Sequence, residues 1–109
     1  MKTLPLILLA LSVTALPALA GEIYGTITEN AKPIGKDVPV TIEIGGKTYS
    51  KSTDEFGGYR IFAAETGKGT AKVPFKGQTL SIEIESYSTP VRFDLVIENK
   101  IGSYTLRRQ

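Results

Sequence analysis

The sequence alternates apolar and polar residues with a period of two from Glu22 to Leu106. Residues 79–86 are a clear example, in which Leu80, Ile82 and Ile84 are separated by Ser and Glu. Successive side chains of a β-strand point to opposite faces, so this pattern predicts strands with one buried and one solvated face. Such segments recur every roughly 8–12 residues between turns, which predicts an all-β chain. We expect an antiparallel β-sandwich of seven or eight strands, or a small barrel.

Two local signals refine this expectation. Gly45-Gly46 can adopt positive φ at both positions, so it predicts a tight hairpin between residues 38–44 and 47–53. Pro39 has no N–H to donate, so its strand is expected at a sheet edge, or with a bulge at that position. The strand register around Pro39 is left open by the sequence.

The first twenty residues have the pattern of a secretory signal peptide. Lys2 precedes an apolar run from Leu4 to Leu16, and a small-x-small cleavage pattern ends at Ala20. A membrane anchor is the alternative, but the run is shorter than the ~20 apolar residues that a bilayer requires. We therefore expect a signal peptide at 1–20, one exported domain at 21–109, and no stable membrane insertion after cleavage.

Composition excludes several classes of function. Lys and Arg total 13 against 11 Asp and Glu, which is too balanced to favour nucleic-acid binding. The chain has no His and no Cys, so the preferred ligands of transition metals and the usual Ser–His and Cys–His pairs are missing. We expect no metal, no cofactor and no enzymatic activity. An exported domain without cysteine suits a bacterial periplasm, although general secretion is also possible.

The segment Thr53-Asp54-Glu55-Phe56-Gly57-Gly58-Tyr59 predicts a structural turn. The Asp54 carboxylate can accept hydrogen bonds from backbone N–H groups just ahead of it, with Gly57 at a φ that other residues avoid. Tyr59 would then enter the next strand facing the core. A calcium loop is the alternative, but Phe56 and Gly57 stand where oxygen ligands would be needed.

These residues resemble a known family. Thr53-Asp54-x-x-Gly57-x-Tyr59 is similar to the T-D-x-x-G-x-[YF] corner of the carboxypeptidase regulatory-like domains, which are transthyretin-like sandwiches. Residues 25–27 and 32–40 resemble the opening strand and the following segment of the same family. The resemblance covers about residues 22–98 and implies a seven-stranded sandwich without catalytic function of its own.

Four residues are candidates for partner binding. Tyr87 lies on a proline-stiffened loop near Arg92, and Tyr and Arg are the residue types of interaction hot spots. Tyr24 has outward parity on its strand, and Tyr49 is expected to be partly exposed. The alternative is that Arg92 pairs with Asp94 on a solvated face while Tyr87 covers the end of the sandwich.

The predicted function is a non-catalytic periplasmic module for protein interaction or structural support. Its partner would be another exported or envelope protein, or a glycan. The alternative is a carrier of a small apolar ligand, or a glycan-binding module. An enzyme would have to be a hydrolase based on carboxylates, Lys or Tyr, and Glu83 and Glu85 share one strand face.

Overall fold

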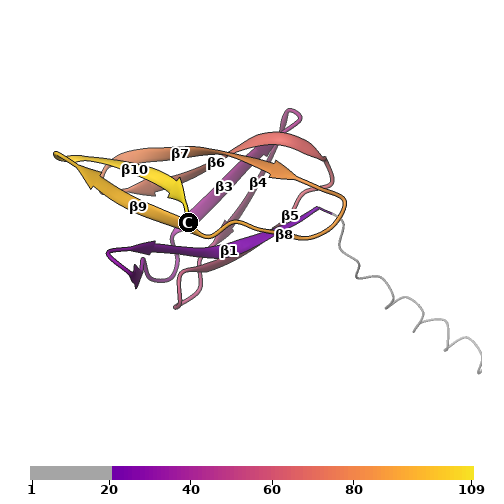
Figure 1. Ribbon diagram of the computed structural model, residues 1–109. Helices are drawn as coiled ribbons and strands as arrows, with labels where there is room; N and C mark the ends of the chain where they lie inside the picture. The colour runs from indigo at the N-terminus through magenta and orange to yellow at the C-terminus, as the bar shows by residue number, and fades with distance from the viewer. Residues whose placement is uncertain (1–20) are drawn as a thin grey trace, which may run out of the picture.

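A computed structural model describes residues 21–109, in which all regular secondary structure is β-strand (Figure 1). The strands are β1 (Glu22–Glu29), β2 (Lys32–Pro33), β3 (Pro39–Ile44), β4 (Lys47–Ser52), β5 (Gly58–Phe62), β6 (Gly67–Phe75), β7 (Gln78–Ser86), β8 (Val91–Arg92), β9 (Leu95–Lys100) and β10 (Ser103–Arg108). β2 and β8 have only two residues each. Within these residues there is no helix long and apolar enough to cross a membrane. The predicted signal peptide lies outside the described residues.

The strands form two sheets (Figure 1). One sheet has the order β4-β3-β6-β7, and all its pairings are antiparallel. The other has six strands around β1, in which β5 and β8 flank the first half of β1 while β2 and β9 flank the second half. The β1–β8 and β1–β9 pairings are parallel, which alternation cannot reveal because it does not specify the direction of a neighbouring strand.

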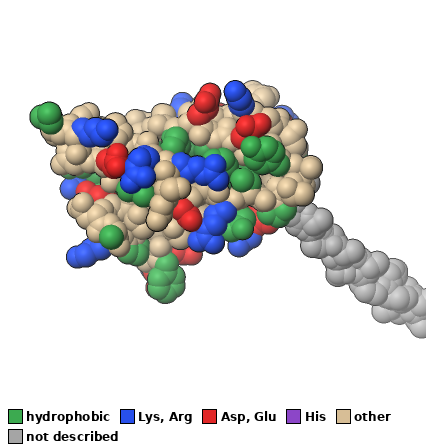
Figure 2. Space-filling model, in the orientation of Figure 1, with side chains coloured by type: hydrophobic (Ala, Val, Ile, Leu, Met, Phe, Trp, Pro, Cys, Tyr) green, Lys and Arg blue, Asp and Glu red, His purple; other side chains and the backbone are tan. Residues whose placement is uncertain are grey.

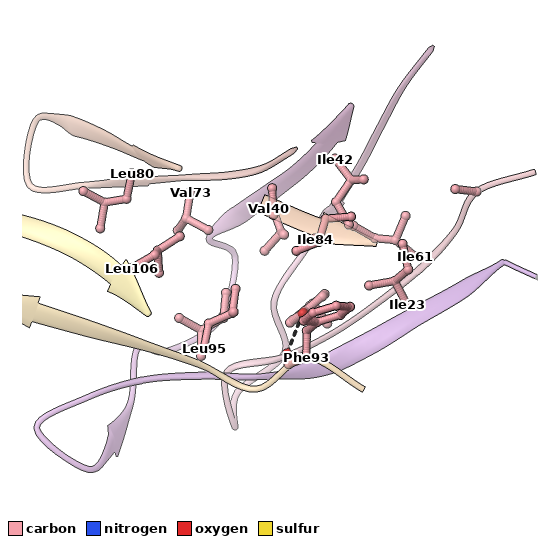
Figure 3. Packing of buried hydrophobic residues seen from close by; sticks show 14 of the residues in the cluster. Ile23, Val40, Ile42, Ile61, Val73, Leu80, Ile84, Phe93, Leu95 and Leu106 are labelled. Carbon is pink, nitrogen blue, oxygen red and sulfur yellow. Dashed lines mark hydrogen bonds between the residues drawn. The ribbon is translucent and has the colours of Figure 1, made fainter. Parts of the chain in front are cut away.

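The hydrophobic core lies between the two sheets (Figure 3). Both sheets contribute inward-facing residues of the alternating pattern. The buried hydrophobic residues are Ile23, Ile27, Val40, Ile42, Ile44, Tyr59, Ile61, Ala63, Ala71, Val73, Leu80, Ile84, Phe93, Leu95, Ile97 and Leu106. The predicted β-sandwich is confirmed, because two sheets share one apolar interior.

The β3–β4 hairpin turns at Gly45-Gly46, which have φ values of 57° and 81°. Ile44 pairs with Lys47, so the hairpin has the expected two-residue loop. Pro39, however, does not lie in an edge strand: β3 is paired with β4 on one side and with β6 on the other. The pairing with β6 begins only at Thr41, so Pro39 lies before that ladder and removes no hydrogen bond from it. The expectation of an edge strand was therefore wrong.

Candidate functional site

The turn before β5 is held by the carboxylate of Asp54. Its Oδ1 accepts hydrogen bonds from the backbone N–H groups of Phe56 and Gly58, each at 2.8 Å. Gly57 has a φ of 73°, and a Cβ atom there would lie 2.7 Å from the carbonyl oxygen of Ile27. A side chain at this position would be strained and would also collide with β1. The geometry is that of an Asx-type turn.

Tyr59 joins this turn to the segment between β8 and β9. Its side chain is buried, and its hydroxyl donates a hydrogen bond of 2.6 Å to the carbonyl oxygen of Phe93 (Figure 3). Burial, reinforced by the nearby Asp94 carboxylate, raises the pKa of the Tyr59 hydroxyl far above its ordinary value. Tyr59 is therefore a neutral hydrogen-bond donor that fixes the chain around Phe93.

A row of three side chains crosses the outer face of the six-stranded sheet. Tyr24 on β1 is directly opposite Arg60 on β5 and directly opposite Arg92 on β8. The guanidinium carbons of Arg60 and Arg92 lie 5.0 and 5.7 Å from the centre of the Tyr24 ring. Both distances are within the range of cation–π attraction, so the ring and the two cations form one cluster.

Each arginine of this row is paired with a less exposed carboxylate. Arg60 contacts Glu22, whose side chain is only 9% exposed. Within residues 21–109 the Oε2 atom of Glu22 has no other partner, so Arg60 alone compensates that oxygen. Arg92 Nε donates to Asp94 Oδ2 at 2.8 Å, while Asp94 Oδ1 accepts from the backbone N–H of Thr26 at 2.9 Å. Each guanidinium group is thus held in place by a neighbouring carboxylate.

The electrostatics of Asp94 fit this arrangement. Desolvation disfavours its charged form, but the hydrogen bonds from Arg92 and Thr26 outweigh it, so the pKa of the Asp94 carboxyl group lies below its ordinary value. Asp94 is therefore ionised at neutral pH and keeps its hold on Arg92.

The row forms part of an open groove of about 500 Å³. The end of β4 and the Asp54 turn provide the rest of its lining. The lining residues are Tyr24, Gly25, Lys51, Ser52, Thr53, Asp54, Gly58, Tyr59, Arg60 and Arg92. They include three cations and one carboxylate, that of Asp54, and two of the cations, Arg60 and Arg92, are also paired with carboxylates outside the lining. In the part of the chain that the structure describes, no three His, Cys, Asp or Glu side chains come together as a possible metal site.

One face of the molecule is shown in Figure 2. On this face Lys and Arg side chains are interspersed with Asp and Glu side chains and with exposed hydrophobic side chains. Such a mixture is ordinary for a protein surface and does not by itself indicate a binding site.

The structure brings together two of the four predicted binding residues. Tyr24 and Arg92 share the groove, whereas Tyr87 lines a separate hollow of about 160 Å³ and is 45% exposed. Tyr49 lies on β4 in the other sheet, where its hydroxyl donates to the Glu65 carboxylate. That hydrogen bond, followed by desolvation, raises the pKa of Tyr49, and the same bond lowers the pKa of Glu65. A binding role for Tyr87 and Tyr49 stays a prediction.

Sequence reasoning missed Glu22, Arg60 and Lys51 as members of this site. The outward parity of Arg60 on its strand was visible, as was that of Tyr24. The sequence did not show that β5 lies beside β1, because neither strand by itself indicates which distant strand it pairs with. Asp54 was recognised only as a turn residue, although it also lines the groove.

No protein-family model matches the sequence, and the search of curated proteins finds no match. Among solved structures, the fold is similar to that of 5-hydroxyisourate hydrolase from Klebsiella pneumoniae. The two share 15% sequence identity with a TM-score of 0.57, and the similarity covers 82% of this chain and 98% of that chain. At this identity the likeness establishes the fold, which is the transthyretin-like β-sandwich.

This finding corrects the predicted function. The sequence led us to expect a non-catalytic interaction or structural module, with a carrier or glycan-binding module as the alternative. A solved protein matched over nearly its whole length is named as a hydrolase. A domain of this fold and size can therefore be an enzyme, so the expectation of a module without chemistry is not supported.

Proposed function

We propose that this protein is a hydrolase of small anionic molecules and that its substrate binds in the groove around Tyr24. The observation that carries the proposal is the row of Tyr24, Arg60 and Arg92, with both arginines anchored by carboxylates and with Asp54 in the same groove. The name of the similar structure, a hydrolase, supports the choice of reaction class.

The chain has no histidine, so the general base must be another group. Asp54 is suited to that role because its Oδ1 is fixed by two backbone N–H groups, which orients the carboxylate. A water molecule would attack a carbonyl carbon of the substrate and pass its proton to Asp54. The C–O or C–N bond of the substrate would then break, and the proton would move to the leaving group.

The cations of the groove would assist this reaction. Addition of water to a carbonyl places negative charge on the carbonyl oxygen. Arg60, Arg92 and Lys51 line the groove and can stabilise that charge. The anchoring of the two arginines matters here, since donors that are already oriented need little reorganisation during the reaction.

The test is to follow the hydrolysis of 5-hydroxyisourate, and of a panel of small anionic lactones and cyclic amides, by absorbance. Asp54→Asn retains an oxygen for the turn but loses the base, so we expect kcat to fall about 100-fold or more. Asp37→Asn is the matched control, because Asp37 is an aspartate outside the groove lining, at a φ of 65° that Asn also tolerates. Hydrolysis no faster than in buffer would refute the proposal, and hydrolysis unaffected by Asp54→Asn would refute the role of Asp54 as the base.

We further propose that residues 1–20 are a signal peptide and that the protein acts in the bacterial periplasm. The sequence Ala18-Leu19-Ala20 before Gly21 and the absence of cysteine support this. A relationship to the carboxypeptidase regulatory-like domains is proposed on the corner motif around Asp54. Mass spectrometry of the protein from a periplasmic fraction is expected to find Gly21 at the N-terminus, and an intact Met1 would contradict export by this route.

A further inference from the structure

We infer that the ligand of the groove carries two separate anionic groups, such as a dicarboxylate, one for each arginine beside Tyr24. This inference rests on the proposed function only in taking the groove as the ligand site. It adds a substrate class that the reaction class does not specify.

The two arginines reach the groove from separate strands. β5 and β8 flank β1 on opposite sides, so Arg60 and Arg92 approach the Tyr24 ring from opposite directions. Their backbones are two strand spacings apart, which is about 10 Å. Each guanidinium carbon lies within about 6 Å of the centre of the Tyr24 ring. A ligand with one anionic group beside each arginine would match this arrangement.

Both arginines keep hydrogen-bond donors for a ligand. Arg92 uses its Nε for Asp94, and Arg60 uses its Nη1 for Glu22. A guanidinium group has five N–H donors, so each arginine retains donors for an incoming anion. Because both line the same groove, a single ligand can reach both.

The charges of the groove favour a ligand with two anionic groups. Each arginine is already paired with a carboxylate, so a ligand with one negative charge gains little from either pair alone. A ligand with two linked anionic groups forms the second contact intramolecularly, at a high effective concentration. Lys51 adds a further positive charge along the same groove. The site therefore discriminates by the number and spacing of anionic groups.

The test uses isothermal titration calorimetry of residues 21–109 at low salt, where exposed charges are least screened. The probes are succinate, glutarate and adipate, with butyrate as the ligand of one charge. We expect the best dicarboxylate to bind about tenfold more tightly than butyrate, with an optimum at one chain length. Arg92→Gln should reduce this preference to about twofold or less, because one of the two contacts is lost.

The control variant is Arg107→Gln, since Arg107 also pairs with a carboxylate, Glu98, but does not line the groove. It should keep the full preference for dicarboxylates. Arg60→Gln alone leaves Glu22 buried without its cation, so the double variant Glu22→Gln/Arg60→Gln tests this arginine while limiting damage to the fold. Circular dichroism verifies that each variant is folded.

Butyrate binding as tightly as every dicarboxylate would overturn the inference, as would a preference that survives Arg92→Gln. Absence of binding by all four probes would overturn it as well. None of these results decides the proposed hydrolase activity, which depends on the hydrolysis assay. Conversely, hydrolysis no faster than in buffer combined with a strong dicarboxylate preference would refute the hydrolase proposal and leave the ligand class in place.

Discussion

The outer faces of the two sheets both carry ion pairs, but the pairs differ in what surrounds them. On the four-stranded sheet, Glu43 and Lys72 lie 3.2 Å apart with side chains that are 47% and 39% exposed. On the six-stranded sheet, Arg60 is paired with a Glu22 side chain that is only 9% exposed. An exposed ion pair is loosely held and contributes little to the free energy of unfolding. A buried carboxylate, in contrast, holds its cation in one place.

Charge on a strand face is therefore a weak signal of a site, because both outer faces present alternating polar residues. Tyr49 of the four-stranded sheet is directly opposite the buried Ile42 and packs against the core, whereas Tyr24 lies on the outer face of the six-stranded sheet. On the six-stranded sheet of residues 21–109, two cations lie beside the Tyr24 ring, and each of them is paired with a carboxylate.

Substituting glycine by alanine should reveal the tighter backbone packing under the groove. A Cβ atom on Gly25 would lie 2.0 Å from the carbonyl oxygen of Phe93, so strands must move apart. We expect Gly25→Ala to lower the free energy of unfolding by about 3 kcal/mol or more. In the other sheet, a Cβ atom on Gly69 would lie 2.3 Å from Cγ1 of Ile44 and 2.5 Å from the carbonyl oxygen of Glu43, which is a less severe overlap with the backbone, and we expect a loss of about 2 kcal/mol. Urea denaturation measures both, and a larger loss for Gly69→Ala would reverse the contrast.

Removing the cation of each ion pair should lower the free energy of unfolding by different amounts on the two faces. Arg60→Gln leaves Glu22 buried and uncompensated, and we expect a loss of about 2 kcal/mol, reduced from the fully buried case because Arg60 is 59% exposed. Lys72→Gln should cost less than about 0.5 kcal/mol. Chemical denaturation at neutral pH is the measurement. Equal losses would mean that Glu22 is solvated and that the arginine is not anchored.

The two hydrogen-bonded tyrosines offer a third comparison. Tyr59→Phe leaves the buried carbonyl of Phe93 without its donor and should cost about 1–2 kcal/mol. Tyr49→Phe removes a hydrogen bond to Glu65 at the surface, where water replaces it, so its loss should be clearly smaller. The midpoint of thermal unfolding ranks the two variants. A larger effect for Tyr49→Phe would contradict the conclusion that the Tyr59 hydrogen bond fixes the chain around Phe93.

The smallest expected effect is the pH dependence that comes from Asp94. The pKa of this carboxyl group is lowered in the folded protein, so its contribution to stability is present above its ordinary pKa. That contribution is lost as the pH falls through the folded pKa, in the range from about pH 4 downwards. Asp94→Asn should therefore flatten the stability curve in acid. Identical curves for wild type and Asp94→Asn would refute this origin.

Much of the fold could be predicted from local patterns. The inward positions of Leu80 and Ile84 follow from alternation, and the Gly45-Gly46 hairpin follows from backbone freedom at glycine. The prediction for Pro39 was wrong because the sequence does not show where the ladder with β6 begins. The parallel position of β8 and β9 beside β1 was equally hidden.

The candidate site could be predicted only in part. Tyr24 and Arg92 were identified as outward-facing residues of binding character, but they were assigned together with Tyr87 and Tyr49, which lie elsewhere. Arg60 carried no local signal, because an arginine on an exposed strand face is usually solvated. Its role depends on Glu22 and Tyr24, both on another strand.

The strands, their buried faces and the tight turns could be read from the sequence, since each of these depends on neighbours within a few residues. The position of β5 and β8 beside β1, which brings two arginines to one tyrosine, became visible in the folded protein. The physical reason is that strand pairing joins segments distant in the chain, and their partners are chosen by packing of the whole sandwich and not by the pattern of any one strand.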